Sequence, residues 1–182
     1  LNLLFVALSL VSVNLYAQSA SLAKAKGLIQ QGQTQDAVVV LRELLAMTEN
    51  AKDKARLEGA IGWAYVKSND YQLAEKFLEQ SLIHANAAGD EKIALRSNNN
   101  LGIALFLQNK LDESRAYFSQ DIAKQSATAK TYLDLIDVKE KEILGQKALL
   151  AGVDSRRNKE FSKAIEKYDL ALKYRPNDSS AL

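Results

Sequence analysis

Side chains suited to chemistry are few in this sequence. His84 is the only histidine and there is no cysteine, which excludes a thiolate nucleophile, a thiolate zinc site and a disulfide framework. No nucleophile-elbow pattern lies near His84, and neither glycine-rich signature of a phosphate-binding loop occurs. We therefore predict a protein that is not an enzyme and that requires no cofactor.

The remaining ionisable candidates have simpler interpretations. Asp90 with Glu91, and Asp112 with Glu113, stand at expected helix starts, where negative charge is favourable beside the helix N-terminus. His84 falls near an expected helix C-terminus, and we predict an exposed side chain there. A metal site at the acidic pairs is the less favoured reading.

Composition predicts the class of fold. The chain has 182 residues, 47% hydrophobic and 25% charged, a balance typical of globular domains. A single proline and eight glycines favour long helices with short loops over a sheet with many turns. The formal net charge of +2 gives no field that would attract nucleic acid, so no nucleic-acid partner is expected.

The first stretch, LNLLFVALSLVSVNLYAQSA, is apolar from Leu3 to Leu15. This run is shorter than the roughly 20 residues of a membrane-spanning helix and is typical of a secretory signal. We predict a signal peptide over residues 1–17, cleaved after Ala17, with the mature chain exported to the periplasm or secreted and without a membrane span. An uncleaved anchor is the alternative.

Small residues recur in the rest of the chain at a repeated spacing. A first small residue is followed twelve positions later by a second, and four positions beyond that by a large side chain. The first positions are Ala25, Gly62, Gly102 and Gly152. The second positions are Ala37, Ala74, Ser114 and Ala164, and the large side chains are Leu41, Leu78, Phe118 and Tyr168.

Turn signals separate the two small positions. Gly32, Asn69 and Asn109 tolerate the left-handed conformation that ends a helix, and Lys159 is the exception. Each unit is therefore predicted to form two antiparallel helices whose small residues face each other at the closest approach. Such a pair leaves an apolar face uncovered, so about three or more copies must stack for stability.

These residues resemble the tetratricopeptide repeat, whose pattern is W-x2-L-G-x2-Y, then A-x3-F, then a late P. The second unit matches it with Ile61, Gly62, Tyr65, Ala74 and Leu78. The fourth unit matches it with Gly152, Ala164, Tyr168, Ala171 and Pro176. The resemblance implies an all-α fold, an α-solenoid of about four helix pairs over residues 18–182, with units near 18–51, 55–88, 95–128 and 145–178.

The units depart from the family in length. The intervals from Ala25 through Gly62 and Gly102 to Gly152 widen beyond the roughly 34 residues of a minimal repeat. Apolar residues at helical spacing before Gly145 predict that the first helix of the fourth unit begins several turns early, and a separate helix ending near Gly145 is the rival. The closing RPNDSSAL resembles a repeat end followed by a helix start, so we expect the natural chain to continue.

The resemblance also implies where a partner would bind. In this family the first helices of the pairs line the concave face, which here gives the candidate peptide-binding residues Arg56, Trp63, Lys67, Arg96, Asn99, Phe106 and Arg156. The same register adds Leu22, Lys26, Ile29, Gly59, Val66, Ile103, Gln146, Leu149, Val153 and Arg157. No acidic residue belongs to the set, so the face suits an acidic or C-terminal peptide. Core packing is the alternative role for Trp63.

One known ligand mode of the family is not indicated. Its chaperone-binding members hold a carboxylate with lysine and asparagine at set places. The corresponding positions here are Leu22, Lys26, Ala60, Arg96 and Asn100. Only the last two resemble the family residues in character.

Three functions remain open at this point. The leading one is an exported, non-enzymatic scaffold that binds a partner peptide or protein segment on its concave face. The second is the repeat segment of a larger exported enzyme or sensor protein, with its catalytic part elsewhere. The third is a repeat that associates only with itself.

Overall fold

The computed structural model describes residues 19–120 and 126–176. The predicted signal peptide and its cleavage site lie outside these residues. The described ranges are helical from residue 19 to residue 30 and then in seven further helices. These are α2 (Thr34–Ala46), α3 (Ala51–Lys67), α4 (Tyr71–Ala87), α5 (Glu91–Leu107), α6 (Leu111–Phe118), α7 (Ala127–Arg157) and α8 (Phe161–Tyr174).

The helix starts follow the expected local chemistry. Asn50, Asp70 and Asp90 precede α3, α4 and α5, and each side chain accepts a hydrogen bond from a backbone N–H of the first turn. Glu91 lies in the first turn of α5, and Asp112 with Glu113 in the first turn of α6. Both acidic pairs therefore stand at helix N-termini, as predicted.

The turns within the pairs share one backbone conformation. Gly32 has φ of 80°, Asn69 of 62° and Asn109 of 64°, all in the left-handed region that the sequence predicted. Lys159, the expected exception, has φ of 61° and adopts the same conformation. The turn geometry is thus kept even where the residue type does not favour it.

The recurring glycines make room for the large side chain of the partner helix. A Cβ at position 62 would lie 2.5 Å from Cγ of Leu78 and 3.2 Å from the carbonyl oxygen of Ala74. At Gly102 the obstacle is the ring of Phe118, 2.5 Å away. The two small positions also face each other as predicted, since the Ser114 hydroxyl donates to the Gly102 carbonyl at 2.8 Å, and the glycine in addition admits the large side chain of the partner helix.

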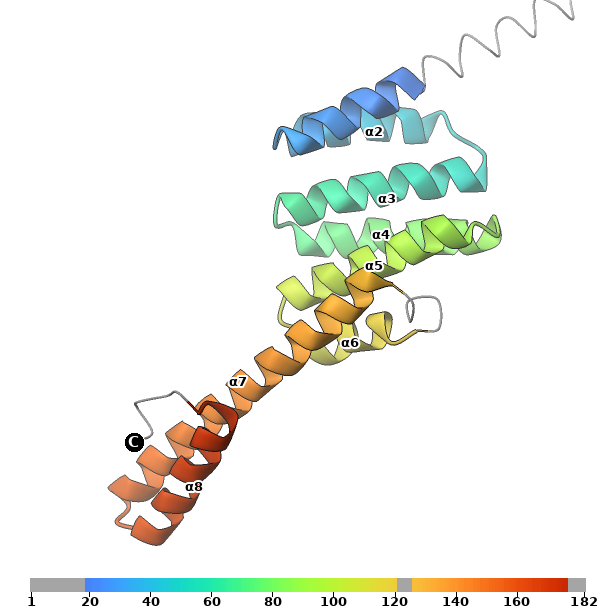
Figure 1. The fold of residues 1–182 in the computed structure, drawn as a ribbon. Helices are drawn as coiled ribbons and strands as arrows, with labels where there is room; N and C mark the ends of the chain where they lie inside the picture. The colour runs from blue at the N-terminus through green and yellow to red at the C-terminus, as the bar shows by residue number, and fades with distance from the viewer. Residues whose placement is uncertain (1–18, 121–125, 177–182) are drawn as a thin grey trace, which may run out of the picture. The chain divides into compact units, whose positions relative to one another are not determined.

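The chain divides into two compact units, residues 1–129 and residues 130–182. In the first unit successive helices stack as antiparallel pairs (Figure 1), and α3 contacts α2, α4 and α5. Its core contains wholly buried large side chains from successive helices, namely Leu41, Ile61, Leu78, Leu101 and Phe118.

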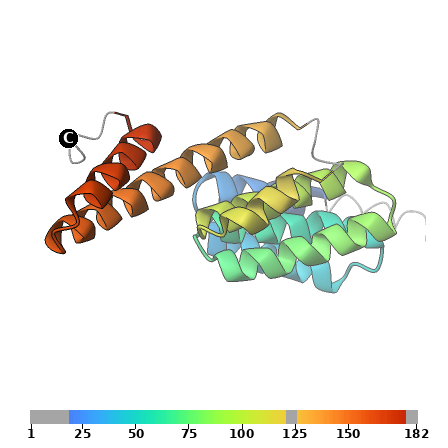
Figure 2. The same ribbon diagram turned by 90° about the horizontal axis from the view of Figure 1, so that it is seen from below.

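In the second unit α8 runs antiparallel along the C-terminal half of α7 (Figures 1 and 2). Ala148 and Leu149 of α7 pack with Ala171 of α8. At Gly152 a Cβ would lie 2.6 Å from the ring of Tyr168, so this pair repeats the glycine contact of the first unit.

Helix α7 is continuous over 31 residues. The prediction of an early helix start is thus confirmed, and the rival, a separate helix ending near Gly145, is wrong. No helix in the described ranges is both long and apolar enough to cross a membrane. The helices and their pairing confirm the predicted all-α, helix-pair architecture.

Candidate functional site

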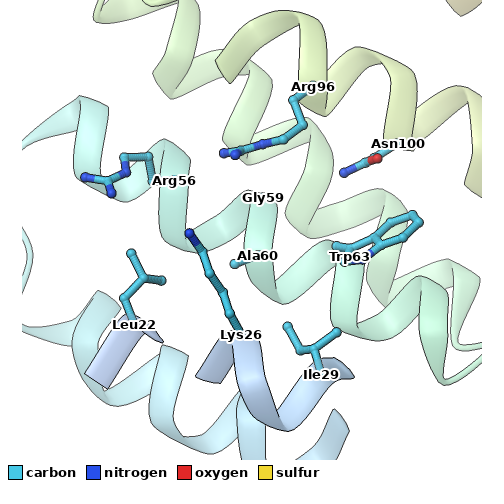
Figure 3. A pocket seen from close by; sticks show the side chains of 9 residues that line it. All are labelled: Leu22, Lys26, Ile29, Arg56, Gly59, Ala60, Trp63, Arg96 and Asn100. Atoms are coloured by element: carbon cyan, nitrogen blue, oxygen red, sulfur yellow. The ribbon is translucent and has the colours of Figure 1, made fainter. Parts of the chain in front are cut away.

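The first helices of three successive pairs meet around a hollow of about 230 Å³ in the first unit. We call it the first hollow. It is lined by Leu22, Lys26, Ile29, Arg56, Gly59, Ala60, Trp63, Arg96 and Asn100 (Figure 3). All nine positions are among those assigned from the sequence to the inward face, to the family's carboxylate-binding places or to both.

Apolar groups form much of its wall. Leu22 and Ile29 come from the helix over residues 19–30, and Ala60 and Trp63 from α3 (Figure 3). Trp63 is half-buried, and Nζ of Lys67 lies 4.9 Å from the centroid of its ring. This cation–π contact holds the indole at the edge of the hollow.

Three cations accompany the apolar wall. Lys26 and Arg96 reach toward the hollow from helices on opposite sides of α3 (Figure 3). Arg56 makes an ion pair with Asp53, with 3.2 Å between Nη1 and Oδ1. Among the described residues, no acidic side chain forms an ion pair with Lys26 or Arg96. The first hollow therefore presents two uncompensated positive charges beside an apolar surface.

A second hollow, of about 350 Å³, adjoins the first. Its lining is Trp63, Lys92, Leu95, Arg96, Asn99, Asn100, Ile103 and Thr128. Trp63, Arg96 and Asn100 line both hollows, so these three residues lie at the boundary between the two.

Buried polar side chains hold α3 against α4 and α5, and we call this group the polar seam. Helix α3 in turn supplies part of the lining of the first hollow. The hydroxyl of Ser81 in α4 donates to the carbonyl of Ala55 at 2.6 Å and lies 2.6 Å from the hydroxyl of Ser97 in α5. A Cβ on Gly59 would lie 2.9 Å from that Ser81 hydroxyl. Glycine at this position therefore lets the three helices approach closely.

His84 belongs to the same seam. Its Nδ1 lies 2.6 Å from a carboxylate oxygen of the buried Glu58, and its side chain is only partly exposed. The prediction of an exposed histidine was wrong, because α3 supplies a partner that the local sequence does not reveal. Within the described ranges, no cluster of three or more His, Asp or Glu residues could hold a metal ion.

The structure brings together only part of the predicted set. Arg56, Trp63 and Arg96 line the first hollow, and Asn99 lines the second. Lys67 contacts Trp63 from outside, while Phe106 is half-buried and lines neither hollow. Arg156 lies near the end of α7 in the second unit.

Two further inward-face candidates belong to the packing instead. Val66 is buried within α3, and Leu149 is buried against α8. Sequence reasoning also missed part of the second hollow, namely Lys92, Leu95 and Thr128. Helical periodicity could have found Lys92, which precedes Arg96 by one turn.

The run Asn98, Asn99 and Asn100 lies in α5, and its three side chains have different surroundings. Asn98 is fully buried, and its amide donates to the carbonyl of Tyr117 at 2.8 Å. The Asn99 amide donates to the hydroxyl of Ser126 at 2.9 Å, and Asn100 lines both hollows.

Comparisons with known proteins agree with this architecture. A sequence profile described as the tetratricopeptide repeat matches residues 57–92, which cover most of α3 and all of α4. No curated protein matches the chain.

Among solved structures, the complex of the TPR2AB domain of yeast Sti1 with pHSP90 is similar in fold, with a TM-score of 0.56. The two sequences are 15% identical, and the match covers 91% of this chain and 67% of that one. Residues 57–92 thus match the tetratricopeptide repeat, and the helix-pair fold of the chain is similar to that of a solved tetratricopeptide repeat domain.

Proposed function

We propose that this chain is a non-enzymatic interaction module that holds a segment of a partner protein in the first hollow. The observation that carries the proposal is the pair of cations, Lys26 and Arg96, that face an apolar hollow without an acidic partner among the described residues. The similar yeast domain was solved as a complex with pHSP90, which supports a protein or peptide as the class of partner.

The chemistry of the hollow favours a carboxylate. Arg96 has a planar set of donors that suits a carboxylate, and Lys26 adds a second charge from another helix. The carboxylate belongs either to an acidic side chain or to the end of a chain. Trp63 supplies the large aromatic contact typical of residues that dominate interface energies.

Binding can be measured with an arrayed library of fluorescein-labelled acidic peptides and the full chain. Fluorescence anisotropy identifies binders, and quenching of Trp63, the only tryptophan, reports contact near the hollow. Removing a charged hydrogen-bonding partner costs about 1.5–3 kcal/mol, so we expect Arg96→Gln to weaken binding by roughly 10-fold or more.

Lys76→Gln is the matched control, because Lys76 is an exposed cation of α4 that lines neither hollow. It should leave the dissociation constant unchanged within about twofold, since it removes only an exposed side chain. Equal effects of the two substitutions, or a bound peptide insensitive to Trp63→Ala, would contradict the proposal.

We also propose that the module acts outside the cytoplasm. The support is the apolar stretch from Leu3 to Leu15 followed by Ala17, the pattern of a cleavable secretory signal. N-terminal sequencing of the protein from its native host tests this. A start at Gln18 is expected, and a chain that retains residues 1–17 would overturn the proposed cleavage.

A further inference from the structure

The proposed function leaves the source of the carboxylate open, and the arrangement of the two hollows decides between the sources. We infer that the ligand is an internal segment of a partner protein, with an acidic side chain at Arg96 and a large apolar side chain in the first hollow. A free chain end is not required. This inference rests on the proposed function and names the ligand of the same site.

The position of Arg96 carries the inference. Arg96 lines the first hollow and the second hollow, as do Trp63 and Asn100. A carboxylate at Arg96 therefore lies at the boundary between two hollows, with one on either side of it. A terminal carboxylate would leave one hollow empty, whereas an acidic side chain lets the peptide continue into both.

The first hollow fits one apolar side chain. At about 230 Å³ it is smaller than the roughly 300–1,000 Å³ of small-molecule sites. Leu22, Ile29 and Ala60 provide no side-chain donor or acceptor. A large aliphatic or aromatic side chain would displace water from this wall, and its burial is favourable at about 25 cal/mol per Å².

The second hollow offers polar groups to the continuing backbone. Asn99 is held in place by its hydrogen bond to Ser126, and Asn100 lies at the boundary between the two hollows. Lys92 adds a further cation, while Leu95 and Ile103 supply apolar surface. This lining of polar and apolar groups suits a bound peptide that continues beyond its acidic residue.

Four labelled peptides test the inference. The first has a Phe-Gly-Glu core, blocked at both ends and flanked by Gly-Ser residues. The second replaces Glu by Gln, the third replaces Phe by Ser, and the fourth ends at the Glu with a free carboxylate. The three blocked peptides are also made with the core reversed, because the direction of the chain in the hollows is not assumed.

The blocked Phe-Gly-Glu peptide, in one of its two directions, should bind within about threefold of the free-ended peptide. Replacing Glu by Gln or Phe by Ser should each weaken binding by roughly 10-fold, as expected for loss of a charged hydrogen bond or of a buried aromatic ring. Binding by the free-ended peptide alone would overturn the inference and leave the proposed function standing.

Protein variants locate the two contacts. Arg96→Gln should weaken the Glu peptide by about 10-fold and the Gln peptide by less than about threefold, because only the former loses a charge pair. Ala60→Leu should fill the first hollow and weaken the Phe peptide more than the Ser peptide. Lys76→Gln and Ala46→Leu, at exposed positions that line neither hollow, are the matched controls.

The possible outcomes distinguish a failure of this inference from a failure of the proposed function. Equal sensitivity of the Glu and Gln peptides to Arg96→Gln would overturn the placement of the acidic side chain. If Ala60→Leu does not fold, the comparison of Arg96→Gln on these two peptides still tests the inference. Binding by none of these peptides, while another peptide of the acidic library binds at Trp63, would overturn the inference alone. Failure of the whole library would overturn the proposed function as well.

Discussion

Helices α4 and α8 occupy the same place in their pairs but differ in how much they bury. In α4 the buried residues are Ala74, Leu78, Ser81 and Ala85, whereas α8 buries only Ala164 and Ala171. Both helices nevertheless place a large side chain against a glycine of the preceding helix, Gly62 in one pair and Gly152 in the other.

The difference in burial follows from which helices pack against α4 and α8. Helix α4 contacts α3 on one side and α5 on the other, while α8 packs against α7 within its own unit. Phe161 and Ile165 of α8 are 63% and 62% exposed. The repeat pattern therefore determines how two helices approach each other, and an adjoining pair determines how much of their surface is buried.

The strongest test of this comparison is truncation of an apolar side chain in each helix. Leu78 is wholly buried, so Leu78→Ala should lower the free energy of unfolding by about 2–5 kcal/mol. Ile165→Ala, at an exposed position, should change it by less than about 0.5 kcal/mol. Urea unfolding followed by circular dichroism and by Trp63 fluorescence measures both. Similar losses would show that α8 is covered to the same extent as α4.

Adding a methyl group at the glycine contact is a finer test. Gly62→Ala gains about 1 kcal/mol of helix propensity but forces its Cβ against the buried Leu78, at a cost of about 1–3 kcal/mol. We expect a net loss of up to about 2 kcal/mol from these two terms.

Gly152→Ala meets the ring of Tyr168, which is only partly buried and has room to rotate outward. This variant should be neutral or slightly stabilising, by up to about 1 kcal/mol. The ranking of the two melting temperatures is the readout, and a larger loss at Gly152 would contradict the comparison.

The turns of the two pairs offer a third test. Asn69 and Lys159 both have positive φ, but lysine pays a steric cost of roughly 1–2 kcal/mol in this region. Lys159→Gly should therefore stabilise the α7 and α8 pair, by about 1 kcal/mol after the entropy of glycine is counted. Asn69→Gly should have a smaller effect, since asparagine tolerates this conformation. Hydrogen exchange of the α8 amides measures the local gain.

The smallest expected effect concerns the junction of α4 and α5. The hydrogen bond from Lys52, at 2.9 Å, and that from the Ile93 backbone lower the pKa of Asp90 from 3.8. A lowered carboxyl pKa contributes stability above the unfolded value, and this contribution is lost as the pH falls through the folded value. Stability should thus decline below about pH 4 more steeply in the wild type than in Asp90→Asn, which keeps a capping side chain. An equal decline of stability with falling pH in the wild type and in Asp90→Asn would contradict this prediction.

Several features could be predicted from sequence because their causes are local. A glycine or asparagine that accepts a left-handed backbone marks the turns at Gly32, Asn69 and Asn109. The spacing of small residues predicted the close approach of Gly102 and Ser114, but not that each glycine also faces the large side chain of the partner helix. Helical periodicity likewise predicted that α7 starts early.

Other features depend on contacts between residues distant in the chain. Glu58 meets His84, and Asn98 meets Tyr117, only because the pairs stack in a particular register. The same stacking brings Lys26 and Arg96 to one hollow and buries Val66, which the register of the family had implied for the inward face.

The amino-acid sequence by itself determined the all-α class, the helix pairs and the positions of their turns, since backbone preference and side-chain spacing act within one or two helices. Tertiary structure alone decided which inward-facing residues share a hollow and which are covered. The physical reason is that burial and the pairing of charges depend on the distance between different helix pairs, and packing across the pairs determines that distance.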